Sequence, residues 1–276
     1  MGVNTPVVDR APRYPGRVRL NPVSGQPNVY DMTRADQPTN EGTPINKALL
    51  DQKAYTLTNN VTVYVAPNGN DTTGKGTFAA PYKTIQRAVD DIPKCLGGFH
   101  AVVDIAEGTY PERVTVSGFK GGRLTLGVDG RSVTVNGIYV MASSIVRVYI
   151  SNIAPKERET AFYVGGASNV LVLSSITING ASIATNGIGV EQNSTLAATG
   201  ADVTVNDFVN TGILALTGGK AAFGAINGNS AAGAALRVDS GAVVTYVARN
   251  ITAPTAQLTA GGGRIYSGAQ SNIPIY

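Results

Sequence analysis

The sequence predicts an all-β protein: a single-stranded parallel β-helix with a short capping α-helix and an extended N-terminal arm. The main observation is a repeat in which an apolar residue precedes a corner of small residues. It recurs at Val140, Val164, Val190, Leu216 and Val238, in steps of 24, 26, 26 and 22 residues. A coil of three short strands and three turns needs about two dozen residues. The repeat therefore predicts five or six stacked coils.

A second register, made of asparagines, agrees with the first. Asn152, Asn179, Asn206, Asn227 and Asn250 each follow a β-like segment, with a mean step of 98/4 residues. Asparagine suits a corner because it tolerates the left-handed conformation. Stacked asparagine side chains can also hydrogen-bond from coil to coil. A β-sandwich with evenly spaced turns is the alternative, but sandwiches rarely repeat one asparagine five times in register.

The first segment of the chain has a different composition. Residues 1–44 contain seven of the 14 prolines, and no hydrophobic period of 2 or 3.6 runs through them. Proline fixes φ and removes a hydrogen-bond donor, so this segment cannot build a core of its own. Its apolar residues, such as Tyr30, favour an assembly arm over a flexible tail, which would not need them.

A short helix is predicted at the end of this segment. Thr43 can serve as its N-cap and Pro44 as its first residue, while Ile45 and Leu49 form a short apolar stripe. The predicted arm with this helix covers residues 1–60.

Three segments of the arm resemble the N-terminal parts of bacteriophage tail and fibre proteins. They are residues 14–18, residues 30–36 and, above all, residues 38–46, which contain the turn Glu-Gly-Thr-Pro-Ile-Asn. In such proteins this turn, followed by a helix, often leads into the shaft or spike. The resemblance implies attachment to a virion. The residues predicted for the assembly arm are Tyr14, Pro15, Arg17, Tyr30, Pro44, Ile45 and Leu49.

The cap of the solenoid is predicted at residues 61–100. Residues 61–65 alternate as a strand does, and residues 68–76 are dense in turn residues. Residues 84–92 place apolar side chains at i, i+3, i+4 and i+7, which indicates an amphipathic helix that Pro93 ends. Short strands without intervening helices follow.

This order resembles the opening of right-handed parallel β-helices of the pectin-lyase-like superfamily. The resemblance spans residues 61–137 and includes the segments Pro-Tyr-Lys-Thr-Ile-Gln-Arg-Ala-Val and Glu-Gly-Thr-Tyr-Pro-Glu-Arg-Val-Thr-Val. It extends to pectin methylesterases and phage tailspikes, in which the helix plugs the end of the solenoid. It implies a right-handed β-helix with coils over residues 101–253 and a C-terminal extension over residues 254–276. This fold occurs in lyases, hydrolases, esterases and inert shafts, so the resemblance does not predict which activity, if any, the chain has.

Composition excludes several classes of function. One Cys and one His leave no disulfide framework, no His-based triad and no multi-His metal site, so neither a metal nor another cofactor is expected. No apolar run approaches the roughly 18–20 residues of a membrane span, so no membrane insertion is expected. The 22 basic residues are spread along the chain, which argues against nucleic-acid binding.

Only weak catalytic candidates emerge. Glycoside hydrolysis needs two carboxylates about 5–10 Å apart, and equivalent positions two coils apart are separated by about 10 Å. Glu191 and Asp239 occupy equivalent corners with Thr217 between them. The alternative is that both are solvated corner acids. The run at residues 203–210 departs from the methylesterase motif, so no catalytic role is carried over to it.

A structural role is therefore favoured over an enzymatic one. The sequence indicates a virion protein, a tail fibre, spike or baseplate-associated appendage, that is assembled in the host cytoplasm with other tail or baseplate proteins. Residues 197–276 carry few charges, and such a surface usually faces protein, so a homo-oligomer is predicted, a trimer as in the tailspikes. Exposed Asn, Thr and Ser corners would contact a host-surface glycan. The alternatives are a polysaccharide depolymerase and a bacterial surface adhesin.

Overall fold

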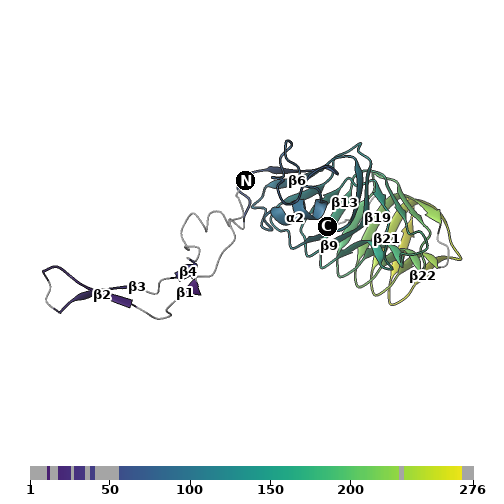
Figure 1. Ribbon diagram of the computed structural model, residues 1–276. Coiled ribbons are helices and arrows are strands. Elements are labelled where there is room, and N and C mark those ends of the chain that lie inside the picture. Colours follow the sequence, from purple (N-terminus) through teal and green to yellow (C-terminus); the bar gives the residue numbers. More distant parts are fainter. Residues whose placement is uncertain are drawn as a thin grey trace. The chain divides into compact units, whose positions relative to one another are not determined.

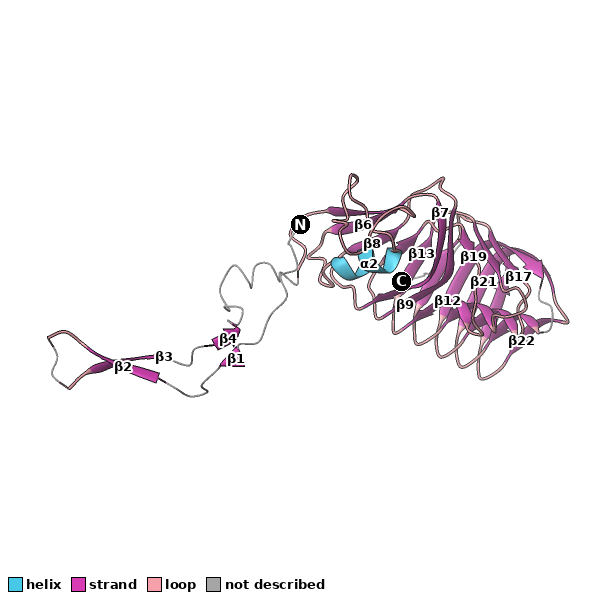
Figure 2. Cartoon of the chain, viewed as in Figure 1, coloured by secondary structure: helices cyan, strands magenta, loops and turns pink. Residues whose placement is uncertain are grey.

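The computed structural model describes residues 11–12, 18–25, 28–34, 38–40, 56–229 and 233–268. The chain divides into two compact units, Met1–Ala54 and Tyr55–Tyr276. In its described residues, the second unit is a parallel β-solenoid of about seven turns with one short helix (Figures 1 and 2). The predicted fold class is confirmed. The predicted number of coils is too low, because the repeat at Val140 begins after the first coils have already formed.

The first unit contains two short antiparallel pairs of strands. β1 (Ala11–Pro12) pairs with β4 (Pro38–Asn40), and β2 (Val18–Pro22) pairs with β3 (Tyr30–Arg34) as a hairpin. Apolar and polar residues alternate only within these two five-residue strands, so no period of 2 runs through the whole segment. The predicted helix at residues 43–50 lies outside the described residues, as do six residues of the predicted arm: Tyr14, Pro15, Arg17, Pro44, Ile45 and Leu49.

The helix that caps the solenoid forms where the sequence predicts it. α2 (Ile85–Asp91) has Thr84 as its N-cap, and the Thr84 hydroxyl accepts a hydrogen bond from the Arg87 amide. Its apolar side chains at Ile85, Ala88 and Val89 are buried, so the helix covers the core at this end of the solenoid. The strand expected before it is β5 (Val61–Val65).

The coils stack into three columns of parallel strands. The first column contains β5, β6 (His100–Ile105), β8 (Arg123–Leu126), β10 (Val146–Val148), β13 (Asn169–Val172), β16 (Thr195–Ala198), the first parts of β19 (Lys220–Asn229) and β21 (Val243–Thr252), and β23 (Arg264–Ser267). The second contains the second parts of β7 (Gly108–Ser117) and β9 (Val133–Met141), then β12 (Thr160–Gly165), β15 (Asn186–Val190), β18 (Thr211–Ala215), β20 (Ala234–Val238) and β22 (Thr255–Thr259). The third contains the first parts of β7 and β9, then β11 (Asn152–Ile153), β14 (Ile176–Asn179), β17 (Val203–Asn206) and the second parts of β19 and β21.

The second column confirms most of the apolar register. Val140, Val164 and Val190 are neighbours on successive strands, and the register continues through Ala215 to Val238. The residue at the predicted place of Leu216 is therefore Ala215, one position earlier in the chain. These inward side chains are buried, as are those of Val146, Val148, Ile150, Val203 and Val205.

The coils also continue past residue 253. β22 pairs with β20 and β23 pairs with β21 in the same parallel register as the earlier coils. The glycines at residues 261–263 form the turn between these two strands. The C-terminal extension predicted from residue 254 thus begins with a further coil.

The asparagine register is only partly right. Asn179 pairs with Asn206, and Asn227 pairs with Asn250, but Asn152 pairs with Thr177. None of these asparagines has a positive φ, because all of them lie in strands. Left-handed residues follow the apolar register at Ala142, Ala167, Gln192, Thr217 and Ser240, and they follow the asparagine register at Ala181, Ser182 and Asp207.

Candidate functional site

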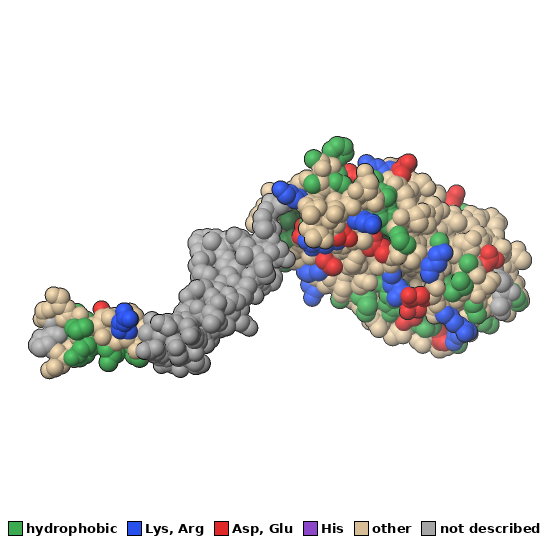
Figure 3. Space-filling model, in the orientation of Figure 1, with side chains coloured by type: hydrophobic (Ala, Val, Ile, Leu, Met, Phe, Trp, Pro, Cys, Tyr) green, Lys and Arg blue, Asp and Glu red, His purple; other side chains and the backbone are tan. Residues whose placement is uncertain are grey.

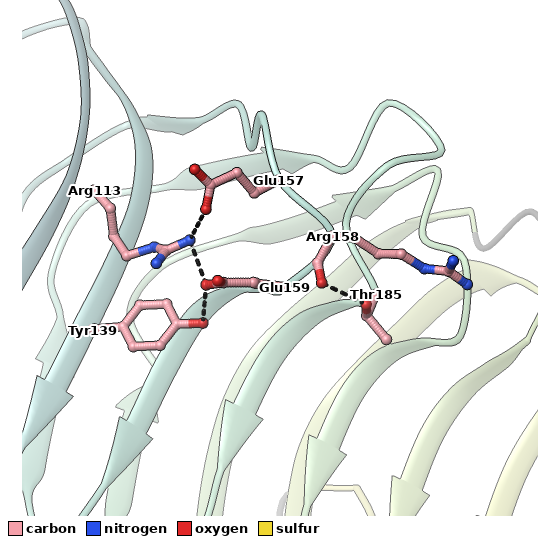
Figure 4. A network of polar contacts seen from close by, with 6 residues as sticks. All are labelled: Arg113, Tyr139, Glu157, Arg158, Glu159 and Thr185. Carbon is pink, nitrogen blue, oxygen red and sulfur yellow. Dashed lines mark hydrogen bonds and ion pairs between the residues drawn. The ribbon is translucent and has the colours of Figure 1, made fainter.

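One cluster of ionic and aromatic side chains lies where β7, β9 and the loop before β12 meet (Figure 4). The Arg113 guanidinium from β7 donates through one nitrogen to Oε2 of Glu157 at 2.7 Å, and the same nitrogen contacts Oε2 of Glu159. The Tyr139 hydroxyl from β9 donates to Oε2 of Glu159 at 3.0 Å. The guanidinium also lies 4.8 Å from the centre of the Tyr139 ring, within the range of a cation–π contact.

This cluster borders a shallow pocket of about 140 Å³. The pocket is lined by Pro111, Glu112, Arg113, Asn136, Pro155, Lys156, Glu157, Glu159, Thr160 and Ala161. Its charged side chains are of both signs. Burial and the hydrogen bond to Glu159 raise the pKa of Tyr139 to about 12. The phenol therefore keeps its proton at neutral pH.

A second tyrosine connects this cluster to the next coil. Tyr163 is the neighbour of Tyr139 in the second column, and the two rings stack with centres 5.4 Å apart and planes inclined by 29°. The Tyr163 hydroxyl donates to Oε2 of Glu191 at 3.4 Å. Burial, followed by the charge of Glu191, raises the pKa of Tyr163.

The two acids proposed from the sequence occupy equivalent positions two coils apart. The amides of Glu191, Leu216 and Asp239 donate in turn to the carbonyl oxygens of three successive strands. The residue between the acids is therefore Leu216 and not Thr217. Asp239 accepts the Ser240 amide at 2.6 Å and lies 3.9 Å from the Arg237 guanidinium. Among the described residues, no side chain joins Glu191 to Asp239.

The third column carries a different feature on its outer surface. Seven successive coils present Thr109, Thr134, Asn152, Thr177, Thr204, Asn227 and Asn250 as direct neighbours. All seven side chains are exposed or half-exposed. Beside them lies a shorter second line, Asn179, Asn206, Asn229 and Thr252. These eleven residues are called the Thr/Asn face below.

The Thr/Asn face is fixed by the core beneath it. Strand residues alternate between the two surfaces of a sheet, and the intervening residues Ile178 and Val205 are fully buried. Hydrogen bonds between coils hold part of the face: the Asn250 side-chain amide donates to Oδ1 of Asn227 at 3.1 Å, and the Asn229 backbone amide donates to Oδ1 of Asn206 at 3.2 Å. A ligand would therefore meet a surface that is already ordered.

Charge is sparse over the surface as a whole. Figure 3 shows positive and negative side chains, singly and in small mixed groups, on a mostly uncharged background over the solenoid. Within the described ranges, no three His, Cys, Asp or Glu side chains gather where they could hold a metal ion. In the same part of the chain, no helix is both long and apolar enough to cross a membrane.

Comparison with protein-family models, with curated proteins and with solved structures gives no match for this chain. The function must therefore be inferred from its own residues. Glu157 and Glu159 belong to the charged run at residues 155–159, and nothing in that run indicates their contacts with Arg113. The signal that could have found the cluster is the pair Tyr139 and Tyr163, which lie in the same register one repeat apart.

Proposed function

We propose that this chain is a structural component of a phage-type tail appendage: a fibre, a spike or a baseplate-associated protein. In this proposal the first unit attaches to other tail or baseplate proteins of the virion, and the solenoid is presented to the host surface. The observation that carries the proposal is the apolar face of the β2–β3 hairpin, in the segment that resembles tail-protein arms.

The hairpin separates apolar from polar side chains. Cross-strand partners share a face, so the neighbours Leu20 and Met32 lie on the same side as the neighbours Pro22 and Tyr30. Leu20 is 59% exposed and Met32 is 70% exposed. On the opposite side, the Asn21 side-chain amide donates to the Thr33 hydroxyl at 3.1 Å.

This apolar face needs a partner. Five of the twelve large hydrophobic side chains that are exposed in the described residues lie between residues 18 and 32. Figure 3 shows green side chains gathered on this hairpin. An isolated two-stranded hairpin is marginal in water, and a contiguous apolar patch marks an interaction site. We assign the covering surface to the particle that carries the appendage.

We further propose that three copies of this chain associate with one another. Residues 197–276 contain only seven charged residues. A long neutral surface of this kind is typical of protein that faces protein.

The attachment is tested with two variants on opposite faces of the hairpin. Leu20→Asn is expected to reduce the amount of the chain in purified particles by about tenfold or more, because burying a leucine contributes about 1.5–3 kcal/mol to association. Thr33→Asn changes the polar face and should leave incorporation unchanged. Quantitative mass spectrometry of the particles measures both. Equal incorporation of the two variants, or absence of the wild-type chain from particles, would refute the attachment.

A second candidate function is cleavage of host polysaccharide. The cluster at Arg113 favours it, because Glu157 and Glu159 contact the same nitrogen and so provide two neighbouring carboxylates, as glycoside hydrolysis requires. Tyr139, with its raised pKa, is a protonated group beside them.

This candidate makes its own prediction. If the chain releases oligosaccharide from host envelope, Glu159→Gln and Tyr139→Phe should lower the rate by about 100-fold or more, as expected for the loss of an acid–base group. Glu107→Gln, the same kind of change at an exposed residue that does not line the pocket, should keep the activity. Reducing-end assays measure the rates. A wild-type chain that releases nothing rejects this candidate.

A further inference from the structure

We infer that Tyr163 and Glu191 form one half of a binding site for a guanidinium group, and that Arg147 of a second copy of this chain supplies this group. The inference rests on the proposed association of copies and names side chains that would join them. The contact lies in the coils before the neutral residues 197–276. It uses the first and second columns of the solenoid and leaves the third column free.

The protein contains a complete site of this kind one coil earlier. The Tyr139 hydroxyl donates to Glu159, and the Arg113 guanidinium contacts the same carboxylate and lies 4.8 Å from the centre of the Tyr139 ring (Figure 4). Two of these three groups recur in the next coil, because Tyr163 is the neighbour of Tyr139 and its hydroxyl donates to Glu191 at 3.4 Å. The chain itself thus shows which group such a tyrosine–carboxylate pair accepts.

The cation is missing from the second site. The neighbour of Arg113 one coil later is Gly137, which has no side chain. In the described part of the chain, no cationic side chain forms an ion pair with Glu191. The Glu191 carboxylate is half-exposed, as is Tyr163. A cation from another molecule can therefore gain both the carboxylate and the aromatic ring.

Arg147 is a cation that lacks such a partner. It lies on β10 in the first column, between Thr125 and Leu171 of the neighbouring strands. Within the described ranges its side chain has no ion pair or hydrogen bond, and its Nε atom is buried without a partner. Two exposed apolar side chains flank the same strands: Ile145 is 42% exposed and Leu173 is 37% exposed. Arginine, tyrosine and apolar side chains together are typical of the core of a protein interface.

Symmetry can bring the two halves together at the same height. Copies in a ring around an axis parallel to their solenoids keep equal heights along that axis, and each copy offers one surface to one neighbour and a different surface to the other. β10 and β12 belong to the same coil, so Arg147 of one copy lies level with Tyr163 of the next. Glu191 follows one coil later, about 4.8 Å along the axis, a distance that an extended arginine side chain spans.

Charge selects this pairing of columns over a symmetric one. Arg123 lies on β8, the strand next to Arg147, and neither arginine has an ion pair among the described residues. The second column presents Glu159 and Glu191 in successive coils. Two first columns in contact would bring the arginines together, whereas a first column against a second column places opposite charges face to face.

The experiment reverses the charges in the full chain and measures the mass of the assembly by sedimentation velocity. Arg147→Glu and Glu191→Arg each place like charges at the contact, so each should weaken association by about tenfold or more. The combined variant Arg147→Glu/Glu191→Arg restores opposite charges and should recover most of the wild-type association. Such recovery distinguishes a contact between copies from a loss of folding.

The matched control is Asp202→Arg, which reverses an exposed acid directly before β17 in the third column. This control should associate like the wild type. Single variants that associate like the wild type, a combined variant no better than the single ones, or an equal loss in Asp202→Arg would overturn the inference. A wild-type chain that stays monomeric rejects the proposed association of copies together with this contact. An assembly of three copies that is insensitive to the reversals rejects this contact alone.

Discussion

Replacing Phe208 with alanine is expected to lower the free energy of unfolding of the solenoid by about 3–5 kcal/mol. Phe208 is fully buried, and its ring fits against two glycines of neighbouring segments. A Cβ atom at Gly180 would lie 2.8 Å from the ring, and one at Gly187 would lie 3.1 Å from it. Truncation would leave a cavity that these glycines, which have no side chains, cannot fill.

The matched control is Phe78→Ala. Phe78 is 83% exposed, and its ring contacts the edge of Tyr64 with centres 5.6 Å apart, so its loss should cost about 1 kcal/mol or less. Thermal unfolding followed by circular dichroism measures both variants. For Phe208→Ala the midpoint should fall by about 6–20 °C in a unit of this size. Similar midpoints for the two variants would show that Phe208 does not support the stack.

The fold could be predicted because its signals are local or strictly repeated. Thr84, Pro93 and the apolar spacing between them are enough to place the capping helix. The repeat at Val140, Val164 and Val190 is visible because successive strands use the same apolar residue at the same place. The prediction is wrong by one residue at Leu216, because the coil after Val190 is one residue shorter than the sequence repeat indicated.

The candidate site could not be predicted in the same way. The Thr/Asn face depends on which threonine stands beside which asparagine, and a shift of one residue turns every side chain to the other surface. Asn152 and Asn179 appear equivalent by spacing, yet they belong to different lines of the face. The contacts of Arg113 join residues 44 and 46 positions apart in the sequence, and no local pattern indicates them.

A rigid stack explains how the two candidate sites can coexist. The Arg113 cluster lies near the edge of the second column, where a loop leaves the coil, whereas the Thr/Asn face uses only strand residues of the third column. Insertions or substitutions in the loop before β12 would alter the Arg113 cluster. They would not change the spacing of the Thr/Asn face, because each coil contacts mainly its neighbours. Variants of the two sites should therefore act independently, as additivity predicts for residues without shared partners.

Replacing Glu112 with alanine is expected to lower the free energy of unfolding by about 2–3 kcal/mol. The Glu112 carboxylate from β7 accepts the backbone amides of Ile85 at 2.7 Å and Gln86 at 2.9 Å, at the start of α2. These two amides have no partner within the helix, so alanine would leave both donors unpaired and loosen the cap on the first coil. Unfolding in urea, followed by circular dichroism, measures the loss.

Glu107→Ala is the control, since Glu107 is exposed and close in sequence, and its effect should stay within about 0.5 kcal/mol. The pH dependence gives a second check. Burial raises the pKa of Glu112, and the hydrogen bonds from Gln86 and Ile85 offset this only in part. A carboxyl whose pKa is higher in the folded than in the unfolded chain contributes most below its unfolded pKa and less as the pH rises through the folded value. The deficit of Glu112→Ala should thus be larger at about pH 4 than at about pH 7, and a deficit that grows with pH would contradict this assignment.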